Sequence, residues 1–482
     1  MKRLQAVLFG ALAVLAACSS STPPTPVVGF SVSASPATAL AGAPVTLTVT
    51  AVDSAGATVR QYRGTVHVSS DDAQAVATAD LVFGNSDQGS KQASFTAKTA
   101  GIVQVTVRDT SSSGLDGSLR LGVTPASAAS CAVLGAPASA RAGTPIAVLV
   151  KFLDGFQNLA IQYAATVHFS STDTRATLPP DTAFGGADSG ERQFGVRLGT
   201  VAAQTVTVSD GTITCSASIT IAAGPAAQFA VTGAPQAAIA GNTVLVAVTA
   251  QDAYGNLAAD YAGTPTPSST DPNASFGTVN SASAGVKQFP VTFGTIGAQT
   301  VTATDAAGFG GTSGAVDVRG LVYISPSTIT AALALVPDTA VSNAGHLVLN
   351  LVAVAPLTGY SAGFNIPADS TRVTVMQIAK GNSLNPGNAP AAIAAALPGT
   401  GPLANVLTSG VSQKAAGAGS VAGNATVAVG QILYTLVLRP TSTVPGTVFD
   451  GSLPGVRAAV RDSDGIEVLT QADFAIGRLD LQ

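Results

Sequence analysis

Residues 238–263 read AIAGNTVLVAVTAQDAYGNLAADYAG, and this stretch decides the fold because it occurs three times. Its other copies begin near Ala39 and Ala140, so the repeat is about one hundred residues long. A solenoid repeat is much shorter than this. Each copy is therefore expected to form a domain of its own.

Apolar and polar residues alternate within each copy. In the first copy Val45, Leu47, Val49 and Ala51 alternate with threonines. The matching sets are Ile146, Val148, Val150 and Phe152 in the second copy, and Val244, Val246, Val248 and Ala250 in the third. A period of two predicts a strand with one buried face, as in an antiparallel sheet. Such strands, separated by Asp-rich and Gly-rich turns, predict an all-β chain of tandem β-sandwiches.

The composition argues against some classes of partner. Charged residues make up only 10% of the chain, and acidic residues outnumber basic ones by 26 to 22. No basic surface is expected to bind phosphate groups, so nucleic acid is not expected as a partner. The chain contains no Trp, which weakens the case for a sugar-binding platform.

The three copies resemble the bacterial Ig-like repeats of the invasin and intimin stalk type. The likeness is carried by the Ala-Gly step, the strand and turn of the form VTVTAxDxxGN, and the Tyr-x-Gly-Thr step at 62–65 and 261–264. The resemblance implies three Ig-like domains, at residues 27–124, 125–223 and 224–320, that act mostly as spacers.

The third copy departs from the other two at one strand. Pro265 and Pro267 stand where the first copy has Val66 and Val68. Proline has no backbone N–H to donate to a sheet. That strand is therefore expected at a sheet edge, or to be locally unpaired.

The N-terminus is typical of an exported lipoprotein. Lys2 and Arg3 precede an apolar run that is too short to span a bilayer comfortably. Residues 15–18 read LAAC, which resembles the bacterial lipobox. This resemblance implies lipidation of Cys18; the alternative is an ordinary signal peptide cut after Ala17.

The lipobox resemblance also divides the first 26 residues. It implies a signal peptide at 1–17, followed by a lipidated cysteine and Pro-rich tether at 18–26. Ser19 is similar to the outer-membrane sorting pattern of such lipoproteins. The protein is expected outside the cytoplasm, attached by lipid to the outer membrane or cell surface.

The other two cysteines both lie in the second copy. Cys131 occupies the position that Phe30 and Phe229 hold in the other copies, and Cys215 alternates with apolar residues of a late strand. Both side chains are expected to face inward, and an extracytoplasmic compartment is oxidising. A Cys131–Cys215 disulfide is predicted; the alternative is two free buried thiols.

Residues 321–482 lie outside the repeats and are expected to form a larger C-terminal β-sandwich. A Gly/Ala/Pro-rich insertion at 381–423 separates its early strands from its late strands, and residues 388–397 predict one short helix within it. The order of strands weakly resembles cohesin-type and related jelly-roll modules. Cohesins bind dockerins, but no motif here carries that binding over.

Several motifs suggest chemistry but are better explained as structure. Gly359–Gly363 reads GYSAG, the pattern of a hydrolase nucleophile elbow, yet a strand-like segment follows and no His lies beyond His346. His67 and His168 share a repeat position on the solvent face, and the third copy has Thr266 there. We expect surface histidines there and not a metal site.

Acidic residues suggest two further sites. Asp462, Asp464 and Glu467 partly match a calcium loop without its spacing, and together with Asp450 they form the one carboxylate cluster worth testing for an enzyme. The acidic turns of the repeats could reach a neighbouring domain and share an ion; they are at Asp71, Asp72, Asp173 and Asp271. Polar turns explain them without an ion.

The sequence therefore predicts a lipid-anchored stalk that presents a C-terminal interaction domain for adhesion or envelope scaffolding. No catalytic residue, metal or cofactor is predicted, and the chain is not expected to be an enzyme. The alternative is a carbohydrate- or protein-ligand-binding module with Ig-like spacers, in which an exposed patch lies around Tyr360, Tyr434 or Phe449. A surface hydrolase is the weaker alternative. The partner expected in either case is a protein or glycan at the C-terminal domain, besides the membrane.

Overall fold

The computed structural model describes residues 25–77, 79–381, 383–384, 391–413 and 423–482. In these ranges the chain is built from strands, as the alternation predicted. The helical turns among them are three short 3₁₀ turns, at Asn85–Asp87, Gly186–Asp188 and Gln471–Asp473. Cys18 and its signal lie outside the described residues.

A membrane-spanning helix was sought in the same ranges. None of the helices found there is long and apolar enough to cross a bilayer.

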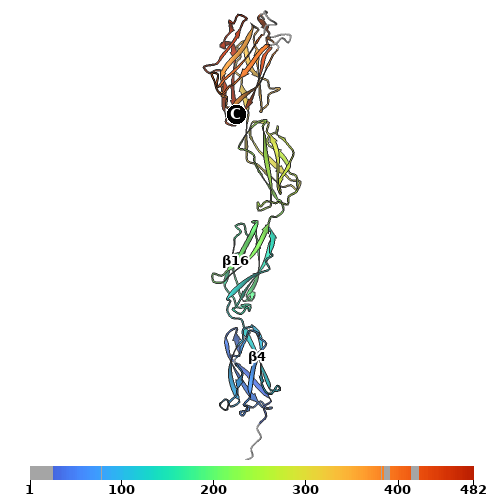
Figure 1. The fold of residues 1–482 in the computed structure, drawn as a ribbon, viewed down its shortest axis with the longest axis vertical. Coiled ribbons are helices and arrows are strands. Elements are labelled where there is room, and N and C mark those ends of the chain that lie inside the picture. The colour runs from blue at the N-terminus through green and yellow to red at the C-terminus, as the bar shows by residue number, and fades with distance from the viewer. Residues whose placement is uncertain (1–24, 78, 382, 385–390, 414–422) are drawn as a thin grey trace, which may run out of the picture. The chain divides into compact units, whose positions relative to one another are not determined.

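The chain divides into two compact units, Met1–Ala140 with Thr144–Ile221, and Arg141–Gly143 with Ala222–Gln482. Each unit contains essentially two β-sandwiches, whose strands Figure 1 draws as facing layers. We number them sandwiches 1 to 4 in chain order. The predicted domain limits after residues 124, 223 and 320 fall between the last strand of one sandwich and the first strand of the next.

Sandwich 1 shows how the repeated stretch builds a core. One sheet has the order β1 (Gly29–Ser35), β3 (Pro44–Val52), β7 (Ser90–Thr96), β5 (Val76–Ala77), and the other has the order β2 (Thr38–Leu40), β9 (Asp116–Thr124), β8 (Gly101–Asp109), β4 (Thr65–Ser70), β6 (Leu81–Val82). All four predicted inward residues of β3 are buried. The threonines between them face the other way, so the period of two is confirmed.

Sandwich 2 repeats this plan, with β16 labelled in Figure 1. Its sheets are β10 (Ser130–Leu134), β12 (Pro145–Leu153), β15 (Glu191–Arg197), and β11 (Ser139–Arg141), β17 (Thr214–Ala222), β16 (Ala202–Ser209), β13 (Thr166–Ser171), β14 (Thr182–Ala183). The first strand, β10, and the last strand, β17, belong to different sheets.

Sandwich 3 confirms the effect of the two prolines. Its sheets are β18 (Gln228–Thr232), β20 (Thr243–Gln251), β24 (Val286–Thr292), β22 (Ser275–Phe276), with β23 (Asn280–Ser283) also on β24; β19 (Ala237–Ile239), β28 (Val316–Arg319), β25 (Gly297–Gln299); and β21 (Thr266–Ser269), β26 (Val301–Thr304), β27 (Gly310–Thr312). Strand β21, which contains Pro267, lies at a sheet edge. Its counterparts β4 and β13 have a neighbour on both sides.

Sandwich 4 is larger. Its sheets are β29 (Leu321–Ile324), β43 (Arg478–Leu481), β39 (Gly446–Asp450); β34 (Val373–Lys380), β38 (Ile432–Pro440), β31 (Leu347–Ala353), β30 (Leu333–Pro337), β42 (Phe474–Ala475); β32 (Leu357–Gly359), β37 (Ala425–Val427); and β35 (Ala391–Ala396), β36 (Val406–Gln413), β33 (Ser361–Pro367), β40 (Arg457–Arg461), β41 (Glu467–Leu469). One apolar cluster runs through all of it, from Leu321 to Leu481.

The predicted helix in sandwich 4 is wrong over its described part. Residues 391–396 form β35, which pairs with β36 along its whole length. Ile393 and Ala395 face the core and the intervening alanines face out. A helix this short is unstable alone, and pairing with β36 supplies the backbone bonds instead. The segment taken for an insertion thus contributes two strands to the sheet.

A buried aspartate holds one loop in each Ig-like sandwich. Asp72 is 6% exposed and accepts hydrogen bonds from the backbone N–H groups of Lys98 (2.7 Å) and Thr99 (2.9 Å) and from the Thr99 hydroxyl (2.6 Å). Asp173 and Asp271 make the same pair of backbone contacts in sandwiches 2 and 3, at 2.6 to 3.0 Å. These acidic turns are therefore structural caps.

These caps predict an acid-dependent loss of stability. Burial raises the pKa of Asp72, but the bonds donated by Thr99, Lys98 and Gln74 outweigh burial and lower it to about 2. The pKa values of Asp173 and Asp271 are lowered for the same reasons. Because an unfolded Asp titrates near 4, this stabilisation is complete above about pH 4 and is lost as the pH falls towards 2.

We expect the melting temperature to change little between about pH 7 and 5 and to fall steeply between about pH 4 and 2. Circular dichroism melts at stepped pH values measure this. A melting temperature that is unchanged down to pH 2 would show that the caps do not titrate as described.

Candidate functional site

The three aromatic residues around which the ligand-binding alternative would place an exposed patch are not exposed. Tyr434 and Phe449 are buried in the core, and Tyr360 is half-buried. The Tyr434 hydroxyl lies 2.7 Å from the Ser409 hydroxyl, and burial raises the pKa of this phenol. Tyr434 lies on the core face of β38 together with Leu436 and Leu438, whereas Thr435, Val437 and Arg439 on the other face are partly or fully exposed.

The four candidate carboxylates do not meet in a cleft. Asp450, at the end of β39, accepts hydrogen bonds from the backbone N–H group and the hydroxyl of Ser452. Asp462 accepts hydrogen bonds from the backbone N–H groups of Asp464 and Ile466 in the β40–β41 turn. Glu467 pairs with Arg461. Within the described ranges, no group of three or more His, Cys, Asp or Glu side chains is placed to hold a metal ion.

The other sequence motifs also have structural roles. Gly359 ends β32 and Ser361 begins β33, so the GYSAG segment is not the strand–turn–helix of a nucleophile elbow. His67 and His168 are exposed, as predicted. The Nδ1 atom of His67 lies 2.7 Å from Oδ1 of Asp80, and the same distance separates Nδ1 of His168 from Oδ1 of Asp181.

The outer face of the β35–β36–β33–β40–β41 sheet is the candidate site. A hollow of about 950 Å³ lies over it. Its floor is a row of four residues, one from each of four neighbouring strands, and each carries no side chain or only a methyl group. They are Ala394, Gly410, Gly363 and Ala459. A Cβ at Gly363 would lie 2.5 Å from the Ser409 carbonyl oxygen, so the strands approach too closely there for any other residue. We call this hollow the groove.

Polar side chains border the groove on both sides. One bordering row is Ala392, Ser412, Ser361 and Arg461, and the other is Ala396, Thr408, Asn365 and Arg457. Both rows face solvent, because they alternate along each strand with core residues such as Leu407 and Val411. The two arginines lie at the β40 end, where Arg461 also bonds the Gly465 carbonyl.

The groove supplies hydrogen-bonding groups, among them Ser361, Ser412, Asn365 and Gln471 of its lining. Glu467 also lines it and is paired with Arg461. The aromatic ring in its wall, Phe364, is buried beneath the floor. Sugar stacking therefore has no platform here, while a polypeptide segment would find donors and acceptors along both edges.

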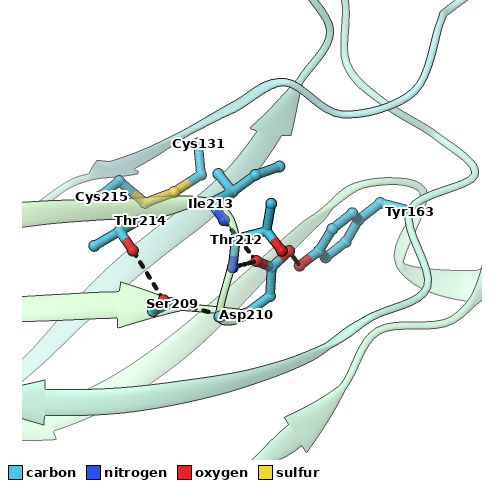
Figure 2. Close-up of a disulfide and its surroundings, with 9 residues drawn as sticks. Cys131, Tyr163, Ser209, Asp210, Thr212, Ile213, Thr214 and Cys215 are labelled. Carbon is cyan, nitrogen blue, oxygen red and sulfur yellow. Dashed lines mark hydrogen bonds between the residues drawn. A yellow bond between two sulfur atoms is a disulfide. The ribbon is translucent and has the colours of Figure 1, made fainter.

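The disulfide in sandwich 2 is a second feature of note. Cys131 on β10 and Cys215 on β17 are joined, with their Cα atoms 5.6 Å apart (Figure 2). Both residues are half-buried. Nearby, Tyr163 donates a hydrogen bond of 2.6 Å to Asp210, and burial together with this bond raises the pKa of the phenol.

Sandwiches 1 and 3 fill the disulfide position differently. There a phenylalanine, Phe30 or Phe229, replaces Cys131, and a glycine, Gly117 or Gly311, replaces Cys215. A Cβ on Gly117 would lie 2.2 Å from the backbone oxygen of Phe30, and one on Gly311 would lie 2.0 Å from that of Phe229. Both distances are too short for a side chain at these positions. In sandwich 2 the aromatic ring comes instead from Phe152, which pairs with Cys131 and stacks on Tyr163.

Comparison with known proteins finds similar solved structures but no matching family model. A scan of protein-family models finds no match, and no curated protein matches the chain. FdeC, an adhesin of Escherichia coli, is 19% identical with a TM-score of 0.35, over 62% of this chain and 99% of its own. The chain is similar to bacterial Ig-like stalk domains.

Two further solved structures show the same likeness. Invasin, a bacterial integrin-binding protein, is 11% identical with a TM-score of 0.28, over 85% of this chain and 99% of its own. The D0–D1 domains of intimin are 16% identical with a TM-score of 0.17, over 40% of this chain and 99% of theirs.

Proposed function

We propose that this chain is an adhesion-type surface protein, in which sandwiches 1 to 3 are spacers and sandwich 4 binds a partner through its groove. The observation that carries the proposal is the contrast between the sandwiches. The polar groups repeated in sandwiches 1 to 3 cap loops, whereas the groove faces solvent between two polar rows. No catalytic activity is proposed.

The partner that fits the groove best is an extended protein segment on another molecule. The floor is wide enough for a main chain because its four residues carry at most a methyl group. Serine, threonine and asparagine side chains along its edges offer hydrogen bonds, and Arg457 favours an acidic residue in the segment, whereas the charge of Arg461 is already paired with Glu467.

A single substitution tests the role of the groove. Ala459→Arg places a long side chain on the floor and is expected to weaken partner binding at least about tenfold, which corresponds to about 1.4 kcal/mol. The measurement is binding of the full chain to a panel of purified extracellular proteins and polysaccharides by surface plasmon resonance.

The matched control is Met376→Arg on β34, in another sheet of sandwich 4, where Met376 is 55% exposed. It adds the same charge and should leave binding unchanged. Binding that survives Ala459→Arg, or that is lost equally in both variants, would rule out the groove as the binding face. Preferential binding of polysaccharides would favour the glycan alternative.

Attachment to the cell envelope through Cys18 is part of the same proposal. Cys18→Ala is expected to move the protein from the membrane fraction to the soluble extracytoplasmic fraction, because the lipid attachment point is lost. Cell fractionation with immunoblotting checks this. Cys131→Ala serves as the control, since it removes a cysteine without affecting the anchor. A membrane-bound Cys18→Ala variant would contradict lipidation at that residue.

A further inference from the structure

The disulfide of sandwich 2 joins the two strands through which the chain enters and leaves that sandwich. Cys131 is the second residue of β10, the first strand, and Cys215 is the second residue of β17, the last. The two strands belong to different sheets, so the half-buried bond links one sheet of the sandwich to the other (Figure 2). The closed loop has a sequence separation of 84 residues, nearly the whole sandwich.

This placement determines how tension travels through sandwich 2. A pull on the two ends passes along the few residues before Cys131, across the S–S bond, and out through the remainder of β17 after Cys215. The hydrogen-bonded strands between the two cysteines are not in the line of force. Even if they melted, the sandwich would lengthen only by the short segments outside the loop.

Sandwiches 1 and 3 have no such bond. Their equivalent positions are Phe30 with Gly117 and Phe229 with Gly311, and the sequence has only three cysteines. Tension on either sandwich is resisted by hydrogen bonds and packing alone, and an opened sandwich extends by about 3.3–3.6 Å per residue. The three repeats therefore differ in mechanical behaviour while sharing a fold.

We propose that the Cys131–Cys215 bond is a mechanical bypass that limits the extension of sandwich 2 under tension to the short segments outside the loop, so that the stalk lengthens mainly by opening its other sandwiches. Its biological use rests on the proposed function, because only a protein held at both ends bears tension. The bypass itself is a property of the purified chain.

Single-molecule stretching of the full chain, held at its two ends, tests the bypass. In the oxidised protein, sandwiches 1 and 3 should each give a long extension step, and sandwich 2 should add no more than about 50 Å. Reduction with dithiothreitol should add one new step of about 300 Å, from 84 residues at about 3.6 Å each. The Cys131→Ser/Cys215→Ser variant should show the same step without reductant.

Two results would overturn the proposal: three equal long repeat steps in the oxidised chain, or no new step on reduction. If the serine variant does not fold, stretching the folded wild-type protein before and after reduction still shows whether the new extension step appears. This outcome is separate from the binding test, because the stretching needs no partner. Failure of the Ala459→Arg experiment would leave the bypass standing, and the reverse also holds.

Discussion

Reduction of the Cys131–Cys215 disulfide is expected to lower the free energy of unfolding of sandwich 2 by about 4–5 kcal/mol. The bond closes a loop with a sequence separation of 84 residues, and opening it restores conformational freedom to the unfolded chain. Hydrogen exchange of peptides from β12 and β16, followed by mass spectrometry with and without reductant, measures the change locally.

Sandwiches 1 and 3 provide the internal control. They share the fold of sandwich 2 but contain no disulfide, so exchange from β3 and β20 should not respond to reductant. An unchanged exchange rate in sandwich 2 after complete reduction would mean that the bond does not stabilise it. An equal change in all three sandwiches would point to a general effect of the reductant.

The second large effect is expected at a loop cap. Asp72→Ala removes a buried acceptor that serves the backbone N–H groups of Gln74, Lys98 and Thr99 and the Thr99 hydroxyl. Donors left unsatisfied away from water cost about 1–3 kcal/mol each, although the loop will relax towards solvent. We expect sandwich 1 to lose about 3 kcal/mol, measured by urea unfolding with hydrogen exchange as the local readout.

The neighbouring residue gives the matched control. Asp71 is exposed and accepts a bond from the Gln104 N–H group, so Asp71→Ala should cost less than about 1 kcal/mol. Asp72→Asn keeps one acceptor oxygen and should fall between the two. Equal effects of Asp71→Ala and Asp72→Ala would show that burial of the Asp72 carboxylate is not what matters.

Local patterns in the sequence predict much of sandwiches 1 to 3. The alternation in 45–51 and its copies defines the central strands, because one face must reach the core. Pro265 and Pro267 correctly indicate the edge strand β21. The alternation of apolar and polar residues likewise predicts that Cys131 and Cys215 point towards the core, and the structure joins these two cysteines in a disulfide.

Sandwich 4 shows where local patterns fail. The Ala-rich segment at 391–396 has high helix propensity, yet pairing with β36 makes it a strand. The ligand-binding alternative would place an exposed patch around Tyr434, but the apolar run of β38 does not reveal that this residue lies on the core face with Leu436 and Leu438. In both cases tertiary contacts outweigh the local preference.

The groove depends on register between strands that are distant in sequence. Gly363, Gly410 and Ala459 form one row only because β33 pairs with both β36 and β40 in a particular alignment. Each is an ordinary small residue when the chain is read in order. The signal in the sequence was a glycine inside each of two strands, Gly363 in β33 and Gly410 in β36, since a glycine inside a strand marks a close approach of backbones.

In the proposed function, sandwich 4 binds the partner and sandwiches 1 to 3 only position it. The most direct measurement counts the attachment of cells displaying the wild-type chain, the Ala459→Arg variant, or a His67→Ala/His168→Ala variant altered on the exposed faces of sandwiches 1 and 2. At equal surface display, we expect at least about tenfold fewer attached cells for Ala459→Arg and wild-type attachment for the histidine variant. Full attachment by Ala459→Arg, or its loss in the histidine variant, would contradict it.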